Sequence, residues 1–93
     1  MRRIRWAPAA ADDLQAISEY LRGHHPTFAQ STIQELYDAA RSLRKFPHRG
    51  RVGEAANTRE LLTLPLPYII VYGIDAEFVH IFRVVHAAEG RLQ

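Results

Sequence analysis

The sequence of 93 residues contains no cysteine, which excludes disulfide bonds and thiolate metal sites and fits a reducing compartment. It also lacks an apolar tract long enough to span a bilayer, and no apolar core of a signal peptide follows Met1. The hydrophobic and charged fractions are those of an ordinary globular protein. We therefore expect a cytoplasmic chain without membrane contact, folded as one domain over residues 1–93 with a single site.

Lysine is also scarce. Lys45 is the only lysine, and the other eleven basic residues are arginine. The planar guanidinium of arginine suits phosphate and carboxylate partners, but a GC-rich genome that encodes arginine in place of lysine explains the same ratio. Because the formal net charge is only +2, the position of the basic residues is more informative than their number.

Common catalytic and metal-binding patterns are missing as well. No glycine-rich phosphate loop follows a strand, no nucleophile elbow is present, and the few serines fall in helical segments. The five histidines include no pair at helical i, i+4 spacing. These absences argue against a hydrolase or a nucleotide-binding enzyme, and we expect neither a metal ion nor a cofactor.

The C-terminal half is rich in β-branched and aromatic residues, which favours strands. Three runs separated by turn-forming segments predict an antiparallel meander, and they occupy residues 59–64, 67–72 and 79–86. The last two runs are apolar at almost every position, so we expect central strands that are covered on both faces. A short strand over residues 2–6 alternates charge and bulk and is expected to pair at one edge.

Two helices are predicted between these strands. The first begins near Pro8, with Asp12 and Asp13 close to its positive end, and stops at residues 23–26; the second runs from Phe28 to about Phe46. Each has an apolar stripe at helical spacing, formed by Ala10, Leu14, Ile17 and Leu21 and by Ala29, Ile33, Leu36, Ala40 and Leu43. The short link predicts an antiparallel helix hairpin packed on one face of the sheet, which is a two-layer α+β fold.

The longest irregular segment, residues 47–58, belongs to a basic stretch. Between Arg41 and Gly53 there are five arginines or lysines and no acidic residue. Loops of this length in compact domains are often functional, and this one is suited to contact anions. A solvated loop without a binding role is an equally open interpretation.

Polar residues in the last strand are the remaining candidates for chemistry. Arg83 and His86 fall on opposite faces by strand alternation, so they need not share a site. A buried Arg83 requires a carboxylate, and we expect Glu60 to form a structural ion pair with it. We interpret His80 as a structural histidine, whereas His86 ends the strand, where a side chain can emerge and titrate near neutrality.

One series of residues extends over nearly the whole chain: Trp6, Ala10, Asp13, Leu14, Ile17, Tyr20, Ala29, Leu43, Phe46, Pro47, Gly50, Arg51, residues 59–61, residues 67–72 and residues 83–86. In order and spacing it resembles the RelE/ParE superfamily of bacterial toxins, and the implied fold matches the one predicted above. RelE-like members cut messenger RNA in the ribosome, and ParE-like members inhibit DNA gyrase. Both are components of type II toxin-antitoxin modules.

The resemblance favours the ParE-like branch. In the ribonuclease branch an arginine typically follows the aromatic residue at the start of the strand where this chain has Ile69. The basic residues of the preceding strand correspond to Glu60 and Leu62, and such replacements remove charge that stabilises a phosphoryl transition state. The resemblance thus implies a gyrase inhibitor, with two alternatives: a ribosome-dependent messenger RNA endoribonuclease, or a non-toxic binding module of the same fold.

The resemblance also implies partners and site residues. An antitoxin encoded beside the toxin is expected to form a hetero-oligomer with it, contacting the helix hairpin and the nearby sheet edge through Trp6, Leu14, Tyr20, Leu36 and Tyr37. Contacts with the target are expected from Arg44, Lys45, Arg49 and Arg51. In a ribonuclease, the remaining catalytic candidates are Arg59, Arg83 and His86.

Overall fold

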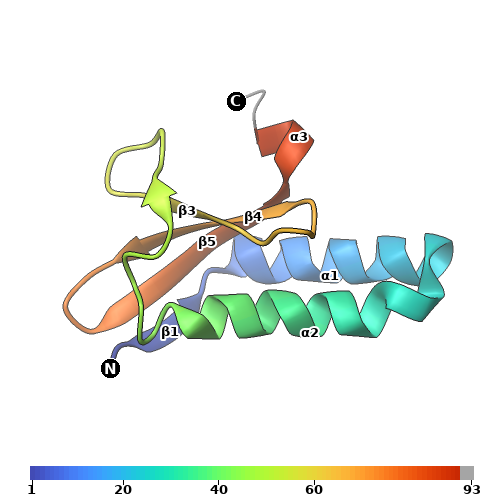
Figure 1. The fold of residues 1–93 in the computed structure, drawn as a ribbon, viewed down its shortest axis with the longest axis horizontal. Helices are drawn as coiled ribbons and strands as arrows, with labels where there is room; N and C mark the ends of the chain where they lie inside the picture. Colours follow the sequence, from blue (N-terminus) through green and yellow to red (C-terminus); the bar gives the residue numbers. More distant parts are fainter. Residues whose placement is uncertain (91–93) are drawn as a thin grey trace.

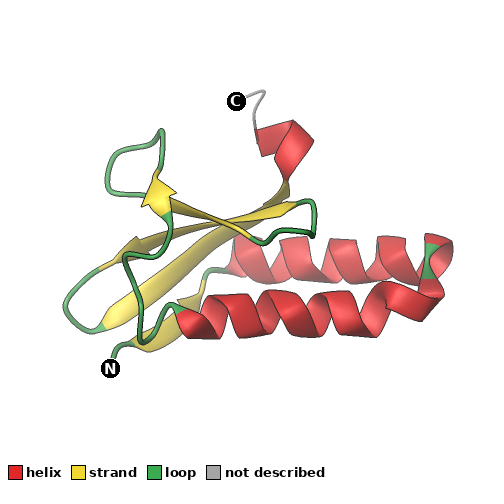
Figure 2. Ribbon diagram, in the orientation of Figure 1, coloured by secondary structure: helices red, strands yellow, loops and turns green. Residues whose placement is uncertain are grey.

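The elements follow one another in the order that the sequence predicts, and the computed structural model describes residues 1–90. They are β1 (Arg3–Trp6), α1 (Pro8–His24), α2 (Pro26–Ser42), β2 (Arg51–Val52), β3 (Arg59–Leu62), β4 (Tyr68–Ile74), β5 (Phe78–His86) and α3 (Ala87–Gly90). One sheet lies against the antiparallel α1–α2 pair (Figure 1). These two helices form one layer and the strands form the other (Figure 2). The predicted α+β class and the strand, helix hairpin and meander order are confirmed.

The five strands have the spatial order β1-β5-β4-β3-β2. The meander of β3, β4 and β5 is antiparallel, and β1 pairs with β5 in parallel, with Ile4 opposite Val79. A parallel pair needs a long crossover connection, and here the intervening helices and meander supply it. The strands β4 and β5 are central, as predicted.

The core lies between the helix pair and one face of the sheet. Fully buried strand residues such as Ile70, Tyr72 and Ile81 pack with Leu36 and Ala40 of α2 in one apolar cluster. Each large apolar side chain removed from water in this way stabilises the fold by about 1.5–3 kcal/mol. Alanines on both helix stripes let the helices approach the sheet closely.

The other face of the sheet, which we call the open face, is not covered by α1 or α2. The short helix α3 rises on that side, above the ends of β4 and β5 (Figure 1). Phe82, on β5, is 39% exposed. The prediction that both faces are covered holds for β4, which is buried or half-buried throughout, and is wrong for β5, where Phe82 and Arg83 are exposed.

Several boundaries differ from the sequence prediction. The helix α2 begins at Pro26, which suits a first helical turn, and ends at Ser42, after which Leu43 and Arg44 donate their backbone N–H groups three residues back. The short strand β2 lies inside the segment predicted to be irregular, and it pairs with β3. No helix within residues 1–90 is long and apolar enough to cross a membrane.

Candidate functional site

Most of the polar residues considered for a site line one groove, which lies between α1, the start of β4 and the end of β5. It encloses about 700 Å³, and its lining includes Asp13, Ile17, Tyr20, Tyr68, Arg83 and His86. We call it the α1–β5 groove. Its walls are partly apolar, with the Asp13 carboxylate on the α1 side and the Arg83 guanidinium and the His86 imidazole on the sheet side.

The polar end of this groove exists because β1 is short. Pairing between β1 and β5 stops at Ile81, and beyond it α1 takes the place of a strand. Asp13 of α1 accepts the Val84 backbone N–H at Oδ2 over 2.9 Å, and it binds Arg83 through Nε at 2.7 Å and Nη2 at 2.9 Å. One carboxylate thus satisfies a strand-edge donor and holds a guanidinium in bidentate geometry.

The ionisation of this pair follows from the same contacts. Burial alone raises the pKa of the Asp13 carboxyl, but the hydrogen bonds from Arg83 and Val84 outweigh it, so the pKa lies below its ordinary value. Hydrogen bonds to Asp13 raise the pKa of Arg83 in turn. Both groups are charged at neutral pH, and the positive charge of Arg83 is offset by its partner.

The Arg83 side chain reaches the groove by bending around the edge of the sheet. Tyr72 lies opposite Ile81 and Val71 lies opposite Arg83, so Phe82 is an extra residue that shifts the alternation of β5. Val79 and Ile81 consequently face the helices, as His86 does. Arg83 and His86 leave the strand on opposite faces, as predicted, but the Arg83 side chain bends around the unpaired strand edge to Asp13.

The predicted ion pair between Arg83 and Glu60 is wrong. Both residues lie opposite Val71 from its two neighbouring strands, so their backbones are about 10 Å apart at two strand spacings. Glu60 instead binds Arg51 of β2 at 2.9 Å. The side chain of Arg83 is 53% exposed, so it is not the buried arginine that the sequence indicated.

His86 ends β5 as predicted and emerges into the groove. Its ring packs edge-on against Tyr68 with 5.7 Å between ring centroids, and its Nδ1 accepts the backbone N–H of Ala88 at 3.2 Å. Burial raises the pKa of Tyr68, so that phenol stays protonated. Because Nδ1 of His86 accepts the Ala88 N–H, Nε2 is the ring nitrogen left for other hydrogen bonds.

Arg59 does not join this pair. It lies opposite Tyr72, on the helix side of the sheet, and its Nε atom is buried without a hydrogen-bond partner within residues 1–90. Along β4, Tyr72 is four residues from Tyr68, the partner of His86, which is about 13 Å. The structure thus brings Arg83 and His86 together and leaves Arg59 elsewhere.

The four basic residues expected to contact a target also separate. Arg51 is paired with Glu60, and Arg49 donates from Nη1 to the Ser42 hydroxyl at 2.7 Å. Arg44 donates from Nε to the backbone carbonyl of Arg2 at 3.3 Å. Lys45 lies beside Arg44 and shares a second hollow with it. The four side chains therefore do not form one patch.

The residues expected to contact an antitoxin divide into surface and core. Tyr20 and Tyr37 are 56% and 43% exposed, and Tyr37 packs edge-on against the half-buried Trp6 at 5.3 Å. Leu14 and Leu36 are core residues with 5% and 0% exposure. Their assignment as partner contacts is therefore corrected: they support the helix pair from inside, because their stripe is the one that faces the sheet.

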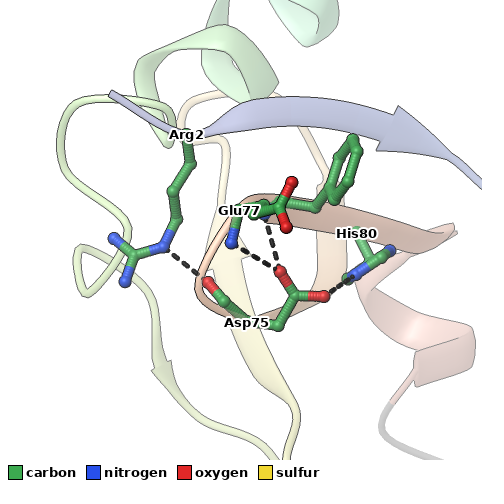
Figure 3. A network of polar contacts seen from close by, with 5 residues as sticks. Arg2, Asp75, Glu77 and His80 are labelled. Atoms are coloured by element: carbon green, nitrogen blue, oxygen red, sulfur yellow. Dashed lines mark hydrogen bonds and ion pairs between the residues drawn. The ribbon is translucent and has the colours of Figure 1, made fainter.

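His80 has the structural partner that the sequence analysis expected for it. Its Nε2 lies 2.7 Å from Oδ2 of Asp75 in the turn between β4 and β5 (Figure 3). The other oxygen of Asp75 accepts the backbone N–H groups of Glu77 and Phe78. Three hydrogen bonds to one carboxylate fix this turn.

Asp13 is the site residue that sequence reasoning missed. The sequence predicts that Asp13 stabilises the positive end of the helix dipole, but α1 has no acidic residue in its first turn. A signal was available, because Asp13 occupies the same helical stripe as Ala10, Leu14 and Ile17 at three- and four-residue spacing. A carboxylate on an apolar stripe requires a cation or a backbone donor.

Comparison with known proteins shows the family to which the chain belongs. The model of the family described as ParE toxin of type II toxin-antitoxin system, parDE, matches residues 4–90. The chain belongs to this family, as the predicted resemblance indicated. It is a toxin of the ParE/RelE superfamily.

Individual relatives fit this assignment. The chain is 41% identical over 88 residues to toxin RelE2 of Caulobacter vibrioides, covering 95% of this chain and 98% of that protein. A chain of the chromosomal ParDE system from P. aeruginosa has a TM-score of 0.86 at 22% identity, over 92% and 96% of the two chains. One of the RelBE2 complex from Mycobacterium tuberculosis has a TM-score of 0.65 at 23% identity, over 91% and 96%. At these identities the two structures show the shared fold alone.

Metal chemistry finds no support in the described residues. Within residues 1–90 no three histidine, aspartate or glutamate side chains gather as ligands. The polar groups of the α1–β5 groove are therefore an arginine paired with Asp13, the exposed His25 and His86, and two tyrosines.

Proposed function

We propose that this toxin acts in the cytoplasm as a ParE-like inhibitor of DNA gyrase and does not cleave messenger RNA. The main support for the proposal is that the positive charge in the α1–β5 groove is already paired with a carboxylate. A phosphoryl transition state requires uncompensated positive charge close to the scissile phosphate. Here the one arginine in the α1–β5 groove, Arg83, is held bidentately by Asp13.

Two strand positions at which the ribonuclease branch carries basic residues support the same proposal. Ile69 stands where the ribonuclease branch carries an arginine, and it is 4% exposed. Glu60, on the preceding strand, is acidic and pairs with Arg51. An aliphatic side chain and a carboxylate at these positions add no stabilisation to a developing negative charge.

A RelE-like ribosome-dependent endoribonuclease is the second candidate. Two observations favour it: a relative 41% identical to this chain carries the name toxin RelE2, and Arg83 and His86 line one groove. His86 is exposed, and a histidine at such a position can act as a general base. This candidate requires Asp13 to release Arg83 on the ribosome.

We further propose that a small antitoxin encoded beside this toxin binds it in a hetero-oligomer. The relatives from P. aeruginosa and M. tuberculosis belong to toxin-antitoxin systems. On this chain the exposed aromatic residues Tyr20 and Tyr37, with the edge of Trp6, offer the anchors that protein interfaces favour. They lie on the helix hairpin and beside β1, as the sequence analysis expected.

The deciding experiment compares two activities of one preparation of folded toxin. Purified gyrase is assayed for negative supercoiling, and programmed ribosomes are assayed for cleavage of bound messenger RNA. We expect supercoiling to be inhibited and the messenger RNA to stay intact. Codon-specific cleavage with supercoiling untouched would replace the first candidate by the second, and inactivity in both assays would favour a non-toxic binding module.

A further inference from the structure

The start of β1, the segment after α2 and the β4–β5 turn lie at the opposite end of the sheet from α3 (Figure 1). These segments line a second hollow. Its lining includes Arg2, Arg3, Arg44, Lys45, Pro47 and Glu77, and we call it the basic pocket. Four cationic side chains from two distant parts of the sequence surround it, against a single carboxylate.

The backbone holds two of these guanidinium groups in place. Arg2 donates from Nε to the carbonyl oxygen of Asp75 at 2.7 Å (Figure 3), and Arg44 donates from Nε to the carbonyl oxygen of Arg2. The backbone N–H of Arg2 points to the carbonyl oxygen of Arg44 at 3.4 Å. Because each anchor uses Nε, the two terminal nitrogens of each guanidinium are left to bind a ligand.

The charges in the basic pocket are not neutralised by the protein. The ion pairs among the described side chains join Arg51 to Glu60, His80 to Asp75 and Arg83 to Asp13, so none involves the four cations of the pocket. The carboxylate of Asp75 turns to His80 and the turn amides, and Arg2 meets only its carbonyl oxygen. Unlike Arg51 and Arg83, which are paired, these four cations line one hollow together.

We propose that the basic pocket binds the phosphodiester backbone of a nucleic acid, with Arg2 and Arg44 directed at phosphate oxygens and Arg3 and Lys45 as flanking charges. Arginine forks match phosphate geometry, and closely spaced cations suit a polyanion with regularly spaced charges. An acidic peptide is the weaker fit, because the apolar part of the lining is limited to Met1, Pro47 and Ala76. The inference does not depend on gyrase being the target.

The test measures binding of the full-length folded toxin to a labelled DNA duplex and to a single-stranded RNA of equal length, both of random sequence, over a range of salt concentrations. The variant is Arg3→Gln with Lys45→Gln, because neither side chain anchors the backbone. The matched control is Arg22→Gln with Arg41→Gln, which removes the same charge from exposed positions on the two helices. Thermal unfolding checks that both variants are folded.

We expect the pocket variant to bind at least about tenfold more weakly in salt on the order of 0.1 M, and its log–log salt slope to fall by about two. The control should keep the slope of the unchanged toxin. The arm that binds more tightly, DNA or RNA, identifies the source of the phosphates. Equal losses in variant and control, no measurable binding to either nucleic acid, or capture of a poly-glutamate peptide in preference to both would overturn the proposal.

Discussion

Two neighbouring aspartates on α1 have different surroundings and different hydrogen-bond partners. Asp12 is exposed, whereas Asp13 is turned toward the sheet and takes three hydrogen bonds from β5. It closes the strand edge that β1 leaves open and pairs with Arg83, which lines the same groove as His86. Under the proposed function, Asp13 is the residue that keeps the charge of Arg83 from a phosphate.

Replacing Asp13 by Asn should lower the free energy of unfolding by about 1–2 kcal/mol at neutral pH. Charged hydrogen bonds to Arg83 and Val84 are lost, although the half-exposed Arg83 limits the ionic share. Because the pKa of Asp13 is lowered in the folded chain, this stabilisation is complete above about pH 4 and disappears as pH falls through the folded pKa. Urea unfolding across this pH range measures it.

Asp12→Asn is the matched control for this variant, with the same chemical change one residue away. It should unfold like the unchanged chain at every pH. A loss of stability equal to that of Asp13→Asn would mean that helix charge, and not the contact with β5, is responsible.

Tyr72 is a second residue whose single polar atom holds a segment in place. Its hydroxyl donates to the Pro47 carbonyl at 2.7 Å and accepts the Gly50 N–H at 2.9 Å. We expect Tyr72→Phe to cost about 1–3 kcal/mol, since two backbone groups lose their partner in a fully buried place. Tyr68→Phe, on the same strand, should cost less, because the Tyr68 hydroxyl makes no hydrogen bond within residues 1–90. Equal costs in chemical unfolding would contradict the assignment.

At the scale of elements, the strands and helices follow from sequence patterns, and the irregularities that build the site do not. Runs of β-branched and aromatic residues predict β4 and β5, and helical spacing of apolar residues predicts both helices with their buried stripes. The bulge at Phe82 has no local signature, since it is set by pairing between strands. The early end of β1 and the partner of Arg83 depend on contacts 70 residues apart in sequence.

The β4–β5 turn is an element whose stability should respond to acid. Hydrogen bonds from His80 first, and then from Phe78 and Glu77, lower the pKa of Asp75 to about 2. Because the pKa of Asp75 is lowered in the folded chain, its contribution to the free energy of unfolding is complete above the unfolded pKa of about 4 and is lost as pH falls toward 2. The unchanged chain should therefore lose stability relative to Asp75→Asn across this window, as measured by urea unfolding. Glu77→Gln should follow the unchanged chain, and a parallel decline of all three would exclude Asp75 as the source.

At the scale of the whole molecule, two of the candidate surfaces lie apart and two meet. The basic pocket and the α1–β5 groove lie at opposite ends of β5. Tyr20 lines the groove and also belongs to the exposed aromatic surface of the helix layer, whereas Tyr37 does not line the groove. An antitoxin that binds Tyr20 would therefore also meet the groove. The separation of the basic pocket from the groove allows each of these two surfaces to be tested by its own variant.

The helix surface gives a prediction for antitoxin binding. Tyr37→Ala removes an exposed aromatic anchor that packs on Trp6, and we expect it to weaken the antitoxin complex about tenfold or more, as interface aromatics commonly do. Gln34→Ala, one helical turn earlier on α2 and also exposed, should change affinity little. Calorimetric titration with the antitoxin measures both. Equal affinities for both variants and the unchanged toxin would move the interface elsewhere.

Growth arrest by variants separates a gyrase inhibitor from a nuclease in the cell. Expression of the unchanged chain alone should arrest growth, and co-expression of the neighbouring antitoxin should relieve it. Harmless expression of folded protein would exclude a toxin.

The variant His86→Gln tests whether the toxin acts as a nuclease. It keeps a side-chain acceptor for the Ala88 N–H but cannot act as a proton-transfer base, and losing that base costs a nuclease about a hundredfold or more in rate. Gyrase inhibition needs no such base, so we expect His86→Gln to arrest growth as fully as the unchanged toxin. If the folded variant is harmless while the unchanged toxin cuts ribosome-bound messenger RNA, His86 and Arg83 form a catalytic pair after all, and Asp13 must be the residue that releases Arg83 on the ribosome.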